Sequence, residues 1–152
     1  MKKFGDDIQN NIYQTMVNPD PKRLPVKFEK WKERARELLE DGPYDYIAGG
    51  AGAEHTMKDN LEAFQRWRII PRMLREVEER DLSVELLGEM YDFPIMQAPI
   101  GVQSIIHPDG EVASAKASAK LGVPYIASSA STIPMEKVAE AMGDAPRWFQ
   151  LY

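Results

Sequence analysis

The sequence predicts an α/β protein in which short parallel strands alternate with helices. Short apolar segments recur at residues 93–96, 123–127 and 147–152, and helical patterns of about ten residues separate the last two from the segment before them. The first two segments run directly into loops rich in Pro, Gly or Ser. Helices of this length between short strands indicate parallel crossovers. Repeated strand–helix units leave two architectures open, a doubly wound open sheet and a TIM barrel.

Composition places the chain among soluble globular proteins and excludes several kinds of site. Of its 152 residues, 43% are hydrophobic and 28% are charged, with a net charge of -5. Nucleic-acid binding would need a clustered basic face, which the sequence lacks. There is no cysteine, so disulfides and thiolate metal sites are excluded, and we expect a cytoplasmic location. We also expect no metal site, no signal peptide and no membrane span.

Residues 1–42 are expected to form a helical extension. A first short helix is predicted near the N-terminus, broken by the Pro-containing segment 18–21. A second helix is predicted over residues 25–41 and is expected to stop at Gly42 and Pro43. The apolar residues at helical spacing are Ile8, Ile12, Tyr13 and Met16 in the first helix, and Phe28, Trp31, Ala35, Leu38 and Leu39 in the second.

The next segment combines tyrosines with a glycine-rich turn and then a third helix. Pro43 suits a first helical turn, and a tyrosine beside the glycines of 49–52 could enter a pocket, although core tyrosines are commoner. The glycines do not have dinucleotide-binding spacing. Thr56 is predicted to cap a helix that continues to Trp67. Leu61 and Phe64 are expected on its buried face, and residues 69–75 are expected to be a connector.

The segment around residues 93–102 organises the second half of the chain. A hairpin around Gly88 is predicted to lead into a buried strand at Ile95 and Met96. Pro99 should end that strand, and Gly101 leaves bare backbone that another group can approach closely. In parallel α/β folds such a loop presents a binding site. The same residues would also form a tight turn that binds nothing.

Two more strand–helix units follow and bring the chain to its last residues. A helix over 111–121 with Gly122 as its C-cap leads to a strand at 123–127, and a helix over 134–142 leads to a strand at 147–152. Three strands cannot close a barrel, which needs eight units and roughly 200 residues or more. We therefore expect the remaining part to come from the same parent chain or from a second chain.

Several separate segments, in the same order along the chain, resemble the FMN-dependent L-2-hydroxy acid oxidases and dehydrogenases. Within that family the similarity is strongest to the lactate oxidase and L-lactate 2-monooxygenase branch. The segments are Tyr44-Asp45-Tyr46-Ile47-Ala48-Gly49-Gly50-Ala51, Asn60-Leu61-Glu62-Ala63-Phe64, Pro71-Arg72-Met73-Leu74, Asp81-Leu82-Ser83, Ala98-Pro99-Ile100-Gly101, Ser128-Ser129 and Phe149-Gln150-Leu151-Tyr152.

The resemblance implies a TIM (β/α)8 barrel of which this chain holds only the N-terminal part. Residues 1–42 would be the helical extension, and residues 43–152 would begin an FMN-binding barrel with its first three strands. The implied reaction is the oxidation of a small L-2-hydroxy acid, with L-lactate expected, and oxygen as acceptor. A homotetramer is expected for the complete protein.

The resemblance also implies roles for seven residues. Tyr46 and Tyr152 would contact the substrate, the first at its carboxylate and the second near its hydroxyl or carboxylate. Backbone of the 99–101 segment would lie against the flavin ring, and two polar side chains would bind its pyrimidine end. These cofactor-binding residues are Pro99, Ile100, Gly101, Ser128 and Gln150.

No catalytic residue is expected within this chain. The family's catalytic histidine, its substrate-binding arginine, its flavin-contacting lysine and its phosphate loop would all follow Tyr152. His55 precedes a helix and His107 lies in a loop, so neither is expected to replace the base. The chain by itself is therefore expected to be inactive. The alternatives are a non-catalytic half-barrel that serves as a binding or assembly module, and another flavin or phosphate-sugar TIM barrel.

Overall fold

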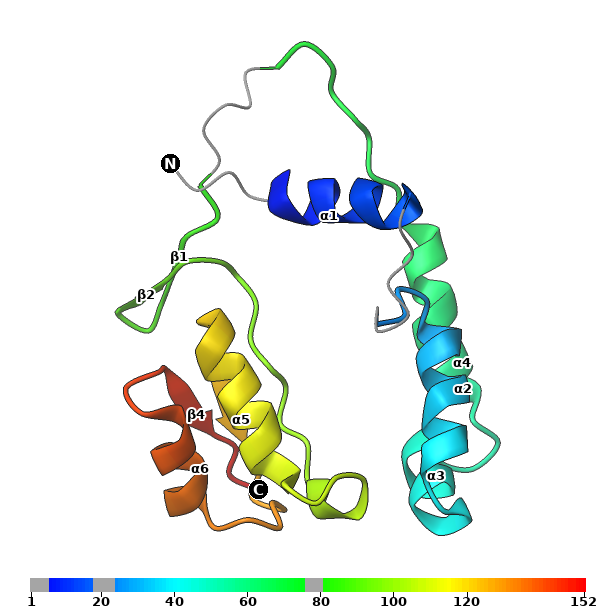
Figure 1. The fold of residues 1–152 in the computed structure, drawn as a ribbon, viewed down its shortest axis with the longest axis vertical. Helices are drawn as coiled ribbons and strands as arrows, with labels where there is room; N and C mark the ends of the chain where they lie inside the picture. Colours follow the sequence, from blue (N-terminus) through cyan, green and yellow to red (C-terminus); the bar gives the residue numbers. More distant parts are fainter. Residues whose placement is uncertain (1–5, 18–23, 76–80) are drawn as a thin grey trace. The chain divides into compact units, whose positions relative to one another are not determined.

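The computed structural model describes residues 6–17, 24–75 and 81–152 of the chain. The backbone divides into two compact units, residues 1–81 and 82–152 (Figure 1). The first unit is helical within its described residues, and the second contains strands and helices in alternation.

Helices make up the regular structure of the first unit. The short helix predicted near the N-terminus is confirmed. The break predicted at residues 18–21 lies outside the described residues. The elements are α1 (Asp6–Val17), α2 (Phe28–Leu38), α3 (Asp41–Ala48), α4 (His55–Ala63) and the 3-10 turn η1 (Phe64–Arg66).

The corner between α2 and α3 differs from the prediction. Leu39 is already extended, so α2 ends before the expected stop, and Gly42 and Pro43 lie in the first turn of α3. Pro43 in a first helical turn is as predicted, because its missing N–H has no helical partner there. The guanidinium of Arg36 spans this corner, 2.7 Å from the carboxylate of Asp41 and 4.8 Å from the centre of the Tyr44 ring. The turn is therefore set by contacts between side chains of both helices.

The predicted cap of α4 by Thr56 is wrong. The helix begins at His55, and the residue before it, Glu54, has a left-handed backbone with φ of 62°. The carboxylate of Glu54 accepts a hydrogen bond of 3.1 Å from the backbone N–H of Gly50, and its carbonyl accepts one from Lys58. Glu54 thus ties the glycine-rich turn to the helix start, and the helix begins two residues earlier than a cap at Thr56 would place it.

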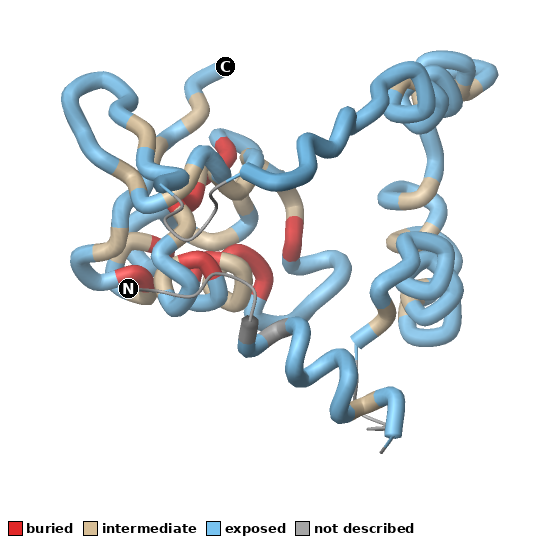
Figure 2. The backbone as a smooth tube through the Cα atoms, turned by 90° about the horizontal axis from the view of Figure 1, so that it is seen from above, coloured by how far each residue is buried: buried red, intermediate tan, exposed pale blue. Residues whose placement is uncertain are grey.

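The apolar faces of α2, α3 and α4 line an open groove of about 520 Å³. Leu61 and Phe64, predicted to be buried, are exposed, and so is Trp67. None of the described residues of this unit is buried (Figure 2). A helical apolar stripe is buried only where another surface covers it, and these three helices do not close over their own stripe.

The second unit opens with the predicted hairpin. Strand β1 (Val84–Leu86) pairs antiparallel with β2 (Glu89–Tyr91). Leu87 and Gly88 between them both have positive φ, 53° and 85°, which is the backbone of a type I′ turn. The indole N–H of Trp148 donates a hydrogen bond of 3.1 Å to the Tyr91 hydroxyl and so fastens the hairpin to the last strand.

Parallel pairing organises the rest of this unit. Strand β3 (Tyr125–Ala127) pairs in parallel with β4 (Arg147–Phe149), and Gln97 forms a parallel bridge with Tyr125. The strand predicted at Ile95 and Met96 is thus reduced to one bridge at Gln97, since prolines at 94 and 99 limit the backbone donors on either side. The connecting elements are η2 (Gln103–Ile105), α5 (Gly110–Leu121) and α6 (Met135–Met142).

The core of the chain lies in the second unit, where α5 packs on β3 and α6. Ala and Ser dominate α5, and such small side chains allow its backbone to lie close to the strand. The buried apolar residues are Ala115, Tyr125, Ala127, Val138 and Met142. Among the described residues, no helix is both long and apolar enough to cross a membrane.

We expect Gly122→Ala to destabilise the second unit by about 1 kcal/mol, because Gly122 ends α5 with φ of 67°, a conformation in which a Cβ is strained. Its N–H bonds back to the last turn, and the N–H of Val123 donates to the carbonyl of Ser118. Urea unfolding measures the change. Lys120→Ala, an exposed change in the same helix, is the control, and equal effects of the two substitutions would contradict the prediction.

Candidate functional site

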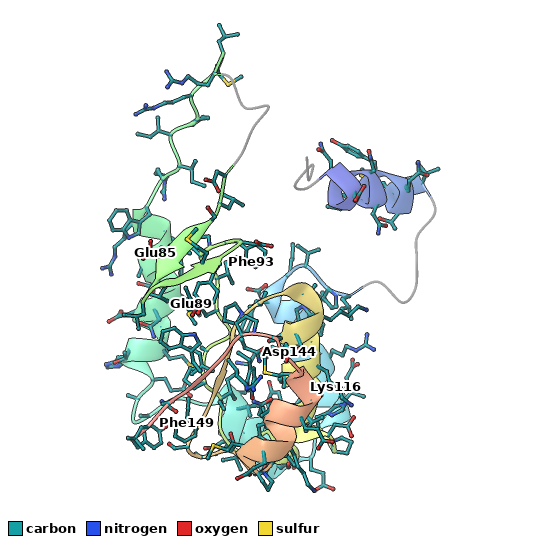
Figure 3. The ribbon with its side chains drawn as sticks, turned by 90° about the vertical axis from the view of Figure 1, so that its left-hand side faces the viewer. Glu85, Glu89, Phe93, Lys116, Asp144 and Phe149 are labelled. Carbon is teal, nitrogen blue, oxygen red and sulfur yellow. The ribbon has the colours of Figure 1, made fainter. Side chains whose placement is uncertain are left out.

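The candidate site lies at the carboxyl ends of the three parallel segments. Because Gln97, β3 and β4 run in the same direction, the loops that follow them meet at one edge. Two backbone hydrogen bonds hold these loops together. Val102 N–H donates to Ala130 O over 3.0 Å, and Gln150 N–H donates to Ala127 O over 2.8 Å. Phe149, labelled in Figure 3, is the last residue of β4 before this edge.

Ser128 and Gln150, both predicted to bind a cofactor, are brought into contact here. The Ser128 side chain is buried, with 4% of its surface exposed. Its hydroxyl donates to Gln150 Oε1 over 3.1 Å and accepts a hydrogen bond from the backbone N–H of Ala130 over 3.2 Å. Within the described part of the chain, Gln150 Nε2 has no hydrogen-bond partner. Ser128 therefore fixes the orientation of the Gln150 amide and leaves its NH2 group as a donor for a ligand.

The predicted 99–101 segment lies on the neighbouring loop. Pro99 has no backbone N–H, and the Ile100 side chain is half exposed. A Cβ added at Gly101 would lie 2.9 Å from Cβ of Ala130 and 3.1 Å from its carbonyl oxygen. A side chain at 101 would therefore require a shift of the loop that follows β3.

Val102 has a strained backbone that the sequence did not reveal. Its φ and ψ of 54° and 34° are left-handed, which is rare for a β-branched residue. Strain of this kind costs about 1–3 kcal/mol and persists only where the surroundings fix it. The strained residue stands directly after the predicted cofactor-contacting segment.

The two tyrosines predicted to contact the substrate both have largely exposed side chains. Tyr152 follows Gln150 at the same edge, and its side chain is 87% exposed. Tyr46 lies on α3 in the other unit and is 67% exposed. The structure thus groups the five predicted cofactor residues with Tyr152 at one edge of the second unit, whereas Tyr46 belongs to the first unit.

A buried carboxylate, Glu111, was missed by the sequence reasoning. It lies in the first turn of α5 with 0% exposure. Its Oε1 accepts hydrogen bonds from the backbone N–H groups of Gln103 and Thr132, at 3.1 and 2.9 Å. Its Oε2 accepts from the Thr132 hydroxyl at 2.8 Å and the Ile133 N–H at 3.2 Å. An acidic residue at a helix start was visible in the sequence, but its burial depended on contacts with residues 8 to 22 positions away.

Burial alone would raise the pKa of Glu111, since it disfavours the charged form. Hydrogen bonds from Thr132, from its own backbone and from Gln103 outweigh that effect, so the pKa lies below the ordinary value of 4.5. The carboxylate is therefore charged at neutral pH, and it joins the loop after Gln97 to the loop after β3.

A second buried polar residue, Gln103, extends this network. Its amide nitrogen donates to the Ile100 carbonyl at 3.0 Å and to the Tyr125 hydroxyl at 3.3 Å, and its Oε1 accepts from Ser114 at 2.6 Å. Burial raises the pKa of Tyr125, so its hydroxyl stays protonated at neutral pH. In the described ranges, no group of three His, Asp or Glu side chains is arranged to hold a metal ion.

We expect Gly101→Ala to destabilise the second unit by about 1–3 kcal/mol, because the new Cβ would overlap Ala130. Ala130→Gly removes one of the two clashing atoms, so the double variant should recover part of the loss. Urea unfolding of both single variants and the double variant measures this coupling. Strictly additive effects would show that the two positions do not meet.

We expect Glu111→Gln to cost about 2–3 kcal/mol at about pH 7, because an amide NH2 would face backbone donors. A pKa lower in the folded state means that the unfolded state binds protons more readily. The carboxylate therefore makes its full contribution to the stability of the fold at pH values above its ordinary pKa of 4.5. This contribution is lost as the pH falls through the pKa of the folded state. The stability difference between the parent chain and the variant, from urea unfolding, should shrink between about pH 5 and pH 3. A constant difference over this range would contradict the assigned charge.

Comparisons with known proteins extend over most of the chain. The sequence pattern of the FMN-dependent dehydrogenase family matches residues 35–152. The chain is 40% identical over 129 residues to L-lactate oxidase of Lysinibacillus sphaericus, which covers 85% of this chain and 33% of that protein. It is 43% identical over 122 residues to 2-hydroxyacid oxidase 1 of Homo sapiens, which covers 80% of this chain and 33% of the human protein.

A solved structure of a related protein is also similar to this chain. The crystal structure of lactate oxidase from Pediococcus acidilactici matches with a TM-score of 0.80 at 34% identity, over 88% of this chain and 37% of that one. The chain spans about a third of the length of the curated relatives that it matches. The match to the family pattern begins at residue 35 and includes every residue grouped at the candidate site. The chain belongs to the FMN-dependent dehydrogenase family, whose cofactor is FMN.

Proposed function

We propose that this chain provides the first three strands of a TIM barrel that oxidises an L-2-hydroxy acid, L-lactate in the first instance, with oxygen as acceptor. The observation that carries the proposal is the hydrogen-bonded pair Ser128 and Gln150 at the carboxyl edge of parallel strands, in a chain of this family. In this proposal residues 43–152 belong to the barrel and residues 1–42 form a helical extension.

The residues at the edge are suited to an isoalloxazine ring. Gln150 offers an oriented amide to the polar end of the ring, and Ser128 holds that amide in place. The 99–101 segment offers backbone at this edge for close contact with a flat ring, while its Gly101 packs against Ala130 of the neighbouring loop. FMN, when bound, accepts the two electrons removed from the carbon that bears the hydroxyl group. The protein's part is to bind, orient and shield the reactants.

For the substrate, we propose the roles that the family resemblance implies for Tyr46 and Tyr152. A phenol hydroxyl donates to a carboxylate, and its ring excludes water from that side of the substrate. The names of the relatives, L-lactate oxidase and 2-hydroxyacid oxidase, support a small 2-hydroxy acid. Whether the activity is of the oxidase or the 2-monooxygenase type depends on how long the keto product stays in the site.

The base and the cations of the site would come from the remainder of the barrel, supplied by the same parent chain or by a second chain. His107 is not suited to the base role, since its Nδ1 accepts a hydrogen bond of 3.1 Å from the N–H of Asp109 within its own turn. We further propose a homotetramer for the complete protein. The lack of cysteine supports a cytoplasmic location.

A second candidate function is a half-barrel that binds or assembles without catalysis. Large apolar side chains are exposed along and beyond the last strand. In this proposal they form a surface that another part of a barrel covers. These residues are Phe149, Leu151 and Tyr152.

The visible absorption spectrum of the purified chain tests these two functions. A flavin spectrum that bleaches when L-lactate is added without oxygen would support the enzyme. A flavin spectrum that persists in this chain alone is expected of both functions. Persistence after a second chain with the remaining strands of the barrel is added would support binding without chemistry. Absence of flavin, also after incubation with excess FMN, would contradict a flavin site formed by this chain.

We expect Gln150→Leu to weaken FMN binding by about tenfold, because a hydrogen-bonding amide is replaced by an apolar side chain. The backbone bond from Gln150 N–H to Ala127 is retained, so the fold should be preserved. Titration of FMN fluorescence measures the affinity. Gln65→Leu, at an exposed position of η1, is the matched control and should leave the affinity unchanged.

A further inference from the structure

Glu111 is a fully buried charged group that the proposed function does not use. It lies in α5, whereas the residues proposed to contact flavin lie in the loops after Gln97, β3 and β4. Burying a carboxylate is unfavourable unless hydrogen bonds replace its water. The residues around Glu111 must therefore supply hydrogen bonds that offset the loss of its water.

The hydrogen bonds of Glu111 reach both loops at once. One donor, Gln103 N–H, belongs to the loop after Gln97. The other three, from Thr132 and Ile133, belong to the loop after β3. Ser104 adds a direct link between the loops, with its hydroxyl 2.6 Å from the Thr132 hydroxyl. The carboxylate is thus the common acceptor of two loops that are far apart in the sequence.

Each of these loops carries a residue of the proposed flavin site. Gln103 directly follows the strained Val102, which in turn follows Gly101. On the other loop, the Ser131 hydroxyl donates to the carbonyl of Ser128 over 2.7 Å, and Thr132 comes next. Glu111 therefore holds the chain two residues from Gly101 and four residues from Ser128.

We propose that Glu111 is a positioning residue for the flavin site, which holds the left-handed turn at Val102 and the Ser128 loop in the geometry that accepts FMN. This inference rests on the proposed function. The strained turn needs surroundings that fix it, and the bond from Gln103 N–H to the carboxylate is one adjacent restraint, beside the bond from Val102 N–H to Ala130 O. Without that restraint the turn relaxes, and the backbone at Gly101 moves away from the position that meets the ring.

Relief of strain separates positioning from simple stabilisation. Glycine adopts the left-handed backbone without strain, so Val102→Gly should let the turn keep its shape without the carboxylate. If Glu111 acts by holding this turn, adding Val102→Gly to Glu111→Gln restores FMN affinity. A residue that only supported the core would show no such rescue at a backbone position.

The experiment uses the 152-residue chain and FMN itself as the probe. Dissociation constants come from fluorescence titration of the parent chain, Glu111→Gln, Val102→Gly and the double variant. Amide hydrogen exchange by NMR is recorded on the same samples. Glu140→Gln makes the same chemical change at an exposed site on α6 and is the matched control. Thr132→Val removes the hydroxyl donor to Glu111 together with the bonds of that hydroxyl to Ser104, leaves the backbone donors to the carboxylate in place, and serves as the milder variant if Glu111→Gln does not fold.

We expect Glu111→Gln to raise the dissociation constant about tenfold or more, and the double variant to recover most of that loss. Exchange should become faster at the amides of Gln103, Thr132 and Ile133, while the centre of α5 stays protected. Unchanged affinity in folded Glu111→Gln, or loss without rescue in the double variant, would overturn the inference. If the parent chain itself binds no FMN, a flavin site formed by this chain alone is contradicted and the role of Glu111 toward it is overturned, while the exchange data still decide whether Glu111 holds the loops.

Discussion

Parallel pairing of three short segments is the constraint on which the site depends. Gln97, β3 and β4 run in one direction, so the loops after them emerge at one edge and their residues meet there. Pairing at Gln97 is a single bridge, and it is too short to fix the loop that follows. Side-chain hydrogen bonds supply the remaining order, above all those accepted by Glu111 and those donated by Gln103.

The two units bury their apolar residues to different degrees, and the difference has a physical origin. In the second unit, the small residues of α5 let it pack directly on β3 and α6, which buries Tyr125, Val138 and Met142. In the first unit, the apolar side chains of α2 and α4 are larger and line an open groove. Amphipathic patterning fixes which face of a helix is apolar, but it does not ensure that a partner surface covers that face.

Local rules predicted the elements well where local chemistry decides them. Gly122 ends α5 as expected, and the hairpin turns at Gly88 as expected, because only glycine adopts these backbone angles without strain. The rules failed where a side chain from elsewhere intervened. Glu54 rather than Thr56 precedes α4, since its carboxylate holds the Gly50 turn. The strand expected at Ile95 became one bridge between prolines.

Periodicity, turn residues and matching segments were sufficient to predict the α/β class, the order of strand and helix in the second half, and the family. Tertiary structure alone decided that Ser128 bonds to Gln150 and that Gly101 faces Ala130. It also decided that Glu111 is buried and that Val102 is strained. Each of these features joins residues distant in the chain, and burial and long-range hydrogen bonds leave no local pattern in a sequence.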